Sequence, residues 1–179
     1  DIAVFKYPGD NKTDYIKRII GLPGDTVRIS DGIIFINDQP FKKEKAGIFE
    51  DFHRNGYLEK FDLYKETNDI GKEYLVIDDI SFDGILGANF REGEYFDLNN
   101  TNEYIVPNDH YFVMGDNREH SSDSRILSQV GFVNEQNLVG KAAMIFLSIK
   151  YSNKKIDIFG LQFGKYPDKI RFKRIGKFL

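Results

Sequence analysis

Apolar and polar residues alternate in short runs along the first forty residues, with the two-residue period of β-strands. The runs over residues 2–7 and 15–20 are rich in β-branched and aromatic side chains, which favour strands. Residues 26–30 and 33–37 alternate around Asp31-Gly32, a dipeptide typical of a two-residue β-hairpin turn. The pattern therefore predicts four strands in this part of the chain, the last two forming a hairpin.

Strand character returns in the last third of the chain. Residues 104–106 and 111–114 fit strands, and residues 142–149 form an apolar run typical of a buried strand. Asn134 is a candidate cap for one short helical turn, and residues 156–178 alternate only weakly. The whole pattern predicts a mainly β protein.

The middle of the chain is acidic. Residues 44–103 contain 15 acidic residues against 6 basic ones, with short apolar runs such as 74–77 between them. We expect short strands and turns there, with a short helix over residues 52–64. Blocks of like charge usually cover a solvated surface, so we interpret this acidity as surface rather than as a binding site.

Composition narrows the function classes. A chain of 179 residues suits one domain, or a core with an insert. The net charge of −3 gives no indication of a nucleic-acid partner. The absence of cysteine excludes disulfides, Cys-ligated zinc and a thiol nucleophile. The three histidines show no spacing typical of metal ligands, so we expect no metal and no other cofactor.

The start of the chain suggests a longer polypeptide. No apolar run reaches the roughly 18 residues of a membrane-spanning helix, and no secretory signal pattern is present. The first residue is Asp1, which opens directly on an apolar strand without an initiator methionine. We therefore interpret the chain as a piece of a larger protein.

Two polar motifs stand out against this background. Residues 14–25 combine a strand with the turn sequence Gly-Leu-Pro-Gly-Asp. Residues 115–125, Gly-Asp-Asn-Arg-Glu-His-Ser-Ser-Asp-Ser-Arg, follow directly on the apolar strand at 111–114. Such a loop is either an ordinary turn or a set of side chains presented by a rigid scaffold.

Together these motifs resemble the bacterial type I signal peptidases, membrane-bound serine proteases that remove signal peptides from exported proteins. The family's Lys-Arg-x-x-Gly-Leu-Pro-Gly-Asp motif matches residues 17–25, and its Gly-Asp-Asn-Arg-x-x-Ser-x-Asp-Ser-Arg motif matches residues 115–125. The family's sequence is also similar to this chain in three further segments, residues 1–8, 131–133 and 137–142. The resemblance implies a β-barrel or sandwich core over residues 1–30 and 104–179, with a β-rich insert over 31–103.

Lys17 is the candidate general base. In a strand it shares a face with Tyr15 and Ile19, and a lysine on such a face is ordinarily a surface residue whose stem packs on apolar neighbours. Burial changes its chemistry, because desolvation lowers the pKa and a neutral amine can accept a proton from a serine hydroxyl. The Ser-Lys dyad is a known variant of the serine protease triad.

The resemblance assigns further roles around Lys17. Ser121 would orient the lysine amine, Asp123 and Arg125 would form a supporting ion pair, and Arg18 would maintain the local electrostatics. The residues that would shape the loop are Gly115, Asp116, Asn117 and Arg118. Glu119, His120 and Ser122 stand at positions that the motif leaves variable.

A substrate would pair with the strand that carries the lysine, by β-strand addition. On this basis Asp14, Tyr15 and Ile16 line the substrate groove, with Val4 on the neighbouring strand, and small residues of the cleavage site enter shallow apolar pockets. The alternative is that Val4, Tyr15 and Ile16 are core residues.

The nucleophile of the family has no counterpart here. Its serine belongs to a Ser-Met-x-Pro motif upstream of the first strand, together with a hydroxyl of the oxyanion hole, and the sequence contains neither. We therefore expect residues 1–179 to be inactive alone. The resemblance further implies pre-proteins as partners and a bacterial inner-membrane enzyme, anchored by an absent N-terminal segment, whose catalytic region is extracytoplasmic.

Two other hypotheses remain open. A Ser-Lys self-cleaving repressor-type protease shares the chemistry but predicts an internal cleavage site and a DNA-binding module, which the sequence does not display. A non-catalytic β module that binds extended peptides along residues 15–20 predicts binding that survives Lys17→Ala.

Overall fold

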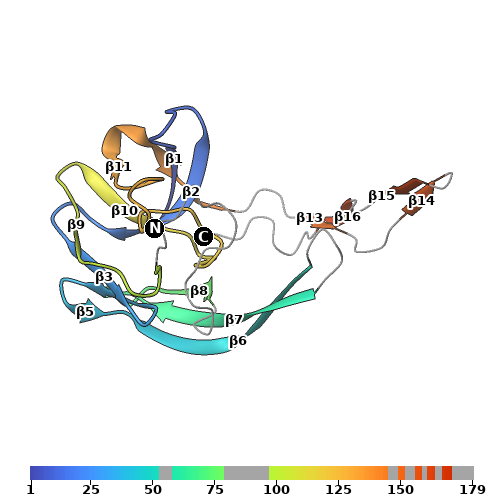
Figure 1. The fold of residues 1–179 in the computed structure, drawn as a ribbon, viewed down its shortest axis with the longest axis horizontal. Helices are drawn as coiled ribbons and strands as arrows, with labels where there is room; N and C mark the ends of the chain where they lie inside the picture. The colour runs from blue at the N-terminus through green and yellow to red at the C-terminus, as the bar shows by residue number, and fades with distance from the viewer. Residues whose placement is uncertain are drawn as a thin grey trace. The chain divides into compact units, whose positions relative to one another are not determined.

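Strands dominate the computed structural model, which describes residues 1–52, 58–78, 97–144, 149–151, 156–158, 161–163 and 167–170 (Figure 1). The predicted mainly β fold is confirmed. The chain divides into two units, one of Asp1–Phe49 with Phe61–Lys141 and one of Glu50–Lys60 with Ala142–Leu179. The division into a core over 1–30 and 104–179 and an insert over 31–103 stays a prediction.

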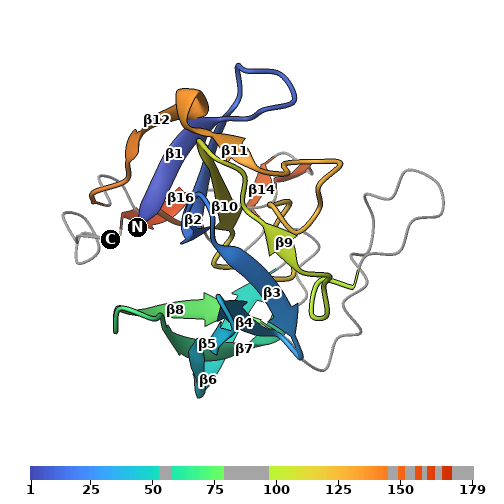
Figure 2. The same cartoon turned by 90° about the vertical axis from the view of Figure 1, so that its left-hand side faces the viewer.

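A five-stranded sheet with the order β11-β10-β2-β1-β12 organises the first unit (Figure 2). Its strands are β1 (Ile2–Lys6), β2 (Asp14–Gly21), β10 (His110–Met114), β11 (Val133–Asn134) and β12 (Leu138–Lys141). The short helix η1 (Glu135–Asn137) precedes β12. Asn134 caps it as predicted, because its side chain accepts a hydrogen bond of 2.9 Å from the Gln136 N–H.

A second sheet has the order β5-β4-β3-β9. Its strands are β3 (Thr26–Ser30), β4 (Ile33–Ile36), β5 (Gln39–Pro40) and β9 (Tyr104–Ile105). The predicted hairpin between β3 and β4 is confirmed. Its turn residues Asp31 and Gly32 have φ values of 49° and 70°, the left-handed conformation that a two-residue hairpin of this type requires.

The acidic middle of the chain contributes a third sheet, β6 (Lys42–Phe52), β7 (Leu58–Thr67) and β8 (Glu73–Ile77). The helix expected over residues 52–64 is wrong where the structure describes it, because β7 pairs with β8 from Leu63 opposite Ile77 to Thr67 opposite Glu73. Strand pairing with a partner distant in sequence outweighs local propensity here. Residues 53–57 lie outside the described part.

The surface interpretation of the acidic block also needs correction. Exposed carboxylates such as Glu73 fit it, but Glu66 is only 1% exposed and Asp78 only 2%. Buried carboxylates are rare unless they are paired, and both of these are ion-paired.

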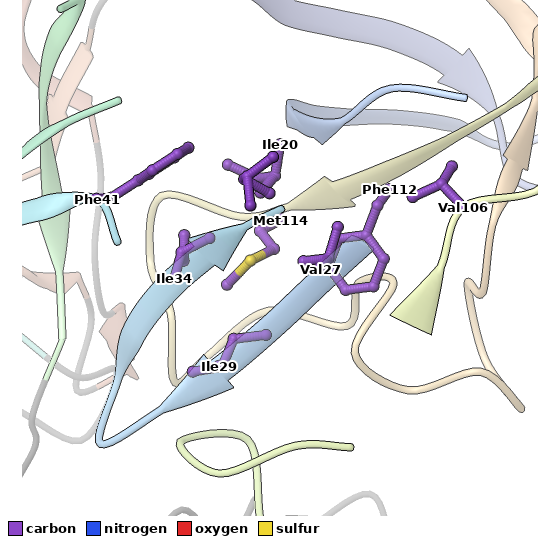
Figure 3. Close-up of a cluster of buried hydrophobic side chains, with 9 residues drawn as sticks. Ile20, Val27, Ile29, Ile34, Phe41, Val106, Phe112 and Met114 are labelled. Atoms are coloured by element: carbon purple, nitrogen blue, oxygen red, sulfur yellow. The ribbon is translucent and has the colours of Figure 1, made fainter. Parts of the chain in front are cut away.

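Two apolar clusters occupy opposite faces of the central sheet, because neighbouring residues of a strand point to opposite sides. On one face Ile20 and Met114 pack against the hairpin of β3 and β4 (Figure 3). On the other face Ile19 and Tyr15 pack against Phe5 and its neighbours. Each fully buried side chain of this size contributes about 1.5–3 kcal/mol, so the sheet is held from both sides.

The second unit contains two strand pairs near the end of the chain. β13 (Ile149–Tyr151) pairs with β16 (Pro167–Ile170), and β14 (Ile156–Ile158) pairs with β15 (Leu161–Phe163). The strand expected over residues 142–149 is wrong at Ala142 and Ala143, which lie outside any strand, and residues 145–148 are not among the described residues. Over the described ranges no helix has the length and apolarity needed to cross a bilayer.

Candidate active site

Lys17 lies at the point where the central sheet meets the polar loop of residues 115–125. It stands opposite Ala3 of β1, whose side chain is buried, and its stem shares the sheet face of Tyr15 and Ile19. The lysine amine donates a hydrogen bond of 2.7 Å to the Ser121 hydroxyl. Two residues 104 positions apart in sequence are therefore in direct contact.

Burial lowers the pKa of the Lys17 amine below its ordinary value. The carboxylates of Asp123 and Asp116 act in the opposite direction, and the guanidinium of Arg125 adds to the lowering. The net direction is downward, so the fraction of neutral amine is larger than for an exposed lysine at the same pH. A neutral amine is the form that accepts a proton.

Gly115 makes this contact possible. A Cβ atom at this position would lie 2.6 Å from the Ser121 Cβ, overlap its hydroxyl oxygen and lie 3.5 Å from the Lys17 amine. The Gly115 N–H donates to the Asp123 carboxylate at 3.0 Å instead of continuing the strand ladder. The chain therefore leaves β10 at Met114 and directs the loop back over Lys17.

The buried ion pair of Asp123 and Arg125 supports the loop. The Arg125 Nε and Nη2 atoms lie 2.9 and 2.8 Å from the two carboxylate oxygens, and both side chains are at most 2% exposed. Burial alone would raise the pKa of Asp123, but Arg125 and the hydrogen bonds from Gly115 and Ser121 hold it below the ordinary value. The carboxylate therefore stays charged and fixes the hydroxyl of Ser121.

The three serines of the loop have different partners. Ser121 is only 3% exposed, with its hydroxyl between Lys17 and Asp123. The Ser124 hydroxyl donates to the Gly131 carbonyl at 2.6 Å and accepts from the Val113 N–H at 2.9 Å. The Ser122 hydroxyl lies 2.6 Å from the side-chain oxygen of Gln129, at the far side of the loop.

Arg18 occupies the opposite face of β2 from Lys17. Its guanidinium forms two hydrogen bonds with the Asp116 carboxylate, at 2.7 and 2.8 Å. The same guanidinium lies 3.8 Å above the ring of Tyr74 in β8, a cation–π contact. The arginine thus connects the motif of β2, the opening of the loop and the third sheet.

Two further motif residues, Asn117 and Arg118, have partners that the sequence did not indicate. Asn117 accepts a hydrogen bond from the His120 N–H at 3.3 Å, and Arg118 is buried against Glu66 of β7. Glu66 and Tyr74 are site residues that sequence reasoning missed. Both lie in the acidic segment, and their sequence neighbourhoods contain no motif that distinguishes them from exposed residues there.

The predicted substrate-binding residues divide between the two faces of the sheet. Val4 and Ile16 are register partners on one face, where Ile16 is 62% exposed. Tyr15 lies on the other face, stacked on Tyr7 with ring centroids 4.9 Å apart. Asp14 is exposed and forms an ion pair of 2.8 Å with Lys6.

One edge of β2 differs from the other along the segment before Lys17. Residues 14–18 pair with β1 over their whole length, whereas pairing with β10 begins only at Arg18, opposite Met114. The backbone on the β10 side of Asp14 to Lys17 therefore has no strand of the described chain as its ladder partner. An extended peptide is suited to occupy such an edge.

Comparison with known proteins shows which family the chain resembles. The family model described as "Signal peptidase, peptidase S26" matches residues 1–147. The signal peptidase I of Rickettsia bellii (strain OSU 85-389) is 37% identical over 179 residues, which covers 98% of this chain and 57% of the relative. That of Rickettsia typhi (strain ATCC VR-144 / Wilmington) is 36% identical over 181 residues, covering 99% and 64%.

Among solved structures, a signal peptidase I from Enterococcus faecalis V583 matches with a TM-score of 0.39 and 25% identity, over 78% of this chain and 91% of that one. The chain spans 57% to 64% of the length of the two curated relatives above. The family model covers well over half of the chain, including both polar motifs. The chain belongs to the signal peptidase family, peptidase S26.

Proposed function

We propose that this chain is the base-bearing part of a serine endopeptidase that removes signal peptides from exported pre-proteins, cutting after small-x-small sequences. Lys17 is the general base. The observation that carries the proposal is the hydrogen bond of 2.7 Å between the Lys17 amine and Ser121, combined with the burial that lowers the pKa of that amine. A neutral lysine on a rigid strand, with a partner that fixes its direction, is the requirement for proton transfer from a serine.

Ser121 acts as the orienting residue. It hydrogen-bonds the Asp123 carboxylate, so its own proton is directed away from Lys17, and its oxygen accepts one N–H of the amine. The lone pair of the neutral amine is then free to face a second hydroxyl. That geometry separates the serine that holds the base from the serine that the base activates.

The reaction follows from this division of roles. The amine of Lys17 takes the proton of the nucleophilic serine hydroxyl while the oxygen of that hydroxyl attacks the scissile carbonyl carbon. The resulting ammonium gives that proton to the leaving amine nitrogen as the peptide bond breaks and an ester forms. A water molecule then loses its proton to Lys17, attacks the ester and releases the signal peptide, and the serine recovers its proton.

We place the nucleophile and the oxyanion hydroxyl outside residues 1–179. Ser121 is 3% exposed, too buried for a peptide carbonyl to approach it, and Ser124 has its hydroxyl bonded on both sides within the protein. The Ser122 hydroxyl is bonded to Gln129. The greater length of the relatives leaves room for a segment that supplies the attacking group.

The substrate occupies the β10 side of β2 before Lys17, extending the sheet as an added strand. Val4 and Ile16 offer an apolar surface beside this edge, and Asp14 stands at its outer end. Tyr15 supports the strand from the opposite face through Tyr7. The whole enzyme works at the bacterial inner membrane, with this region on the extracytoplasmic side.

The test is cleavage of a signal-peptide substrate in detergent. Residues 1–179 are compared with the same chain carrying its native upstream segment, each as the parent and as Lys17→Met. We expect residues 1–179 to be inactive and the extended parent to cleave. In the extended protein, Lys17→Met should reduce the cleavage rate by about 10⁴-fold or more, and Ser121→Ala should retain a measurable part of it.

Two results would contradict the proposal. Cleavage by the extended Lys17→Met protein equal to that of its parent shows that Lys17 is not the base. Cleavage by residues 1–179 that disappears in Ser121→Ala shows that Ser121 is itself the nucleophile.

The available edge of β2 also favours a second candidate, a module that only binds extended peptides. In that case the extended protein is inert. A labelled signal peptide then binds the parent and Lys17→Ala equally well, as measured by fluorescence polarisation.

A further inference from the structure

The third sheet directly contacts the polar loop of residues 115–125. The Ile77 N–H at the end of β8 donates to the Asp116 carbonyl at 2.8 Å, and the Arg118 N–H donates back to the Ile77 carbonyl at 2.9 Å. Ile77 thereby forms a parallel bridge with Asn117. The acidic segment thus supplies a strand end on which the opening of the loop is fixed. This strand, β8, is the edge strand of its sheet, beside β7 (Figure 2).

The strongest contact in this junction is a buried ion pair between Glu66 of β7 and Arg118 of the loop. Two guanidinium nitrogens each lie 2.5 Å from a carboxylate oxygen, and the side chains are 1% and 2% exposed. Burial alone would lower the pKa of Arg118, but the Glu66 carboxylate raises it above the ordinary value. A bidentate pair of this kind fixes direction as well as distance.

A series of contacts connects this pair to the base, passing through the backbone of Arg118. The Arg118 carbonyl accepts from Arg125 Nη2 at 2.5 Å, and Arg125 is paired with Asp123 at 2.8 Å. Asp123 binds the hydroxyl of Ser121, which accepts from the Lys17 amine at 2.7 Å. Each step is between groups that are buried or partly buried, so little solvent separates them.

We propose that Glu66 is a positioning residue of the catalytic site, which fixes Arg118 and through Arg125, Asp123 and Ser121 holds the Lys17 amine in its buried place. The consequence for cleavage rests on the proposed function, whereas the consequence for Lys17 does not. Glu66 acts through geometry rather than through its field, because the charges that shift the pKa of Lys17 are those of Asp123, Arg125 and Asp116.

The experiment compares Glu66→Gln and Glu66→Asp with Glu73→Gln. The control changes the same chemical group on the next strand, where Glu73 is exposed and pairs with Lys65 at 3.0 Å. In residues 1–179, the pH dependence of acetylation of Lys17 by acetic anhydride is followed by mass spectrometry of the peptide that contains it. Only the neutral amine reacts, so the midpoint reports the pKa of Lys17 in the folded chain.

The second readout is signal-peptide cleavage by the full-length protein with the same substitutions. Loss of the carboxylate loosens the loop and admits water to Lys17, so in Glu66→Gln we expect the acetylation midpoint to rise by about one pH unit. We expect kcat to fall by about tenfold or more with little change in KM, because the base is misplaced after the substrate has bound. Glu66→Asp keeps a carboxylate for Arg118 but places it one methylene further away, so its midpoint and kcat should lie between those of Glu66→Gln and the parent.

The outcomes separate the two proposals. If the parent does not cleave but the Lys17 midpoint still moves in Glu66→Gln, the proposed function fails and the positioning role stands. If Glu66→Gln only melts at a lower temperature, with the midpoint and kcat of the folded protein equal to those of Glu73→Gln, the role is structural and the inference is overturned. If Glu66→Gln does not fold, Glu66→Asp provides the test. An acetylation midpoint of Lys17 in Glu66→Asp equal to that of the parent also overturns the inference.

Discussion

Gly115→Ala is the smallest change that should disable the site, because it adds one methyl group at the contact between Ser121 and Lys17. The new Cβ would lie 2.6 Å from the Ser121 Cβ and overlap the hydroxyl oxygen. Carbon atoms in ordinary contact are about 3.5–4.0 Å apart. Ser121 and its loop must therefore move by about 1 Å to accept the substitution.

The movement has two measurable effects. Overpacking a site of this kind costs about 1–3 kcal/mol of stability, which a protein of this size tolerates near room temperature. A displacement of about 1 Å at a catalytic group reduces turnover by about 10²-fold. Activity should therefore fall much further than the folded fraction does.

The assay measures kcat/KM of the full-length protein in detergent, alongside thermal unfolding of the same samples. Gly140→Ala is the matched control, because a Cβ there meets no atom within 4 Å and the residue does not have a left-handed φ. We expect this control to stay within about 0.5 kcal/mol of the parent in stability and close to it in activity.

The reasoning is refuted if Gly115→Ala retains kcat/KM within twofold of Gly140→Ala. That result would mean that Ser121 does not need its present distance of 2.7 Å from the Lys17 amine. The role of Ser121 as the residue that orients the base would then have to be abandoned.

Two further predictions concern charge. Asp116→Asn removes a carboxylate that raises the pKa of Lys17, and it also releases Arg18 from its partner. The Lys17 amine then becomes neutral at lower pH, so the acidic limb of the kcat/KM profile should move to lower pH. A move to higher pH would contradict this. Lys43→Met leaves the buried Asp78 without its ion-pair partner, so the free energy of unfolding measured in urea should fall by about 3–5 kcal/mol. Adding Asp78→Leu should recover most of this loss. A loss near zero would show that the pair does not contribute to stability.

The parts of the fold that depend on neighbouring residues could be predicted from the sequence. The turn at Asp31-Gly32 and the cap at Asn134 each rest on side chains and backbone within a few positions. Strand alternation in residues 2–7 and 15–20 likewise needs no partner to be recognised. The helix expected over residues 52–64 failed because its actual conformation is set by pairing with β8, which no local pattern records.

The candidate site shows the same limit. The ion pair of Asp123 and Arg125 joins residues only two positions apart, but it was expected from the resemblance to a family and not from the spacing. The contact between Lys17 and Ser121 spans 104 positions and was expected only through the resemblance to a family. From the residues alone, a lysine on a partly apolar strand face was better explained as an ordinary surface residue.

The acidic segment illustrates why composition could not reveal the rest. Fifteen acidic residues in one stretch share a chemical type, but burial divides them. Glu66 is buried because β7 places it opposite the loop, and its partner Arg118 lies 52 positions away. Glu73 is seven positions further along the chain and remains in solvent, so the two carboxylates differ only in what the folded chain places beside them.

A loop as polar as residues 115–125 cannot be held by apolar burial alone, and this explains why charge pairs converge on it. Arg18 binds its opening, Asp123 and Arg125 pair within it, and Glu66 reaches it from the third sheet. Buried ion pairs are often no more stabilising than apolar replacements of the same shape, because removing charges from water is costly. What such pairs provide here is a fixed direction at each step. Lys17, the base that we propose, is partly buried and depends on that direction more than on total stability.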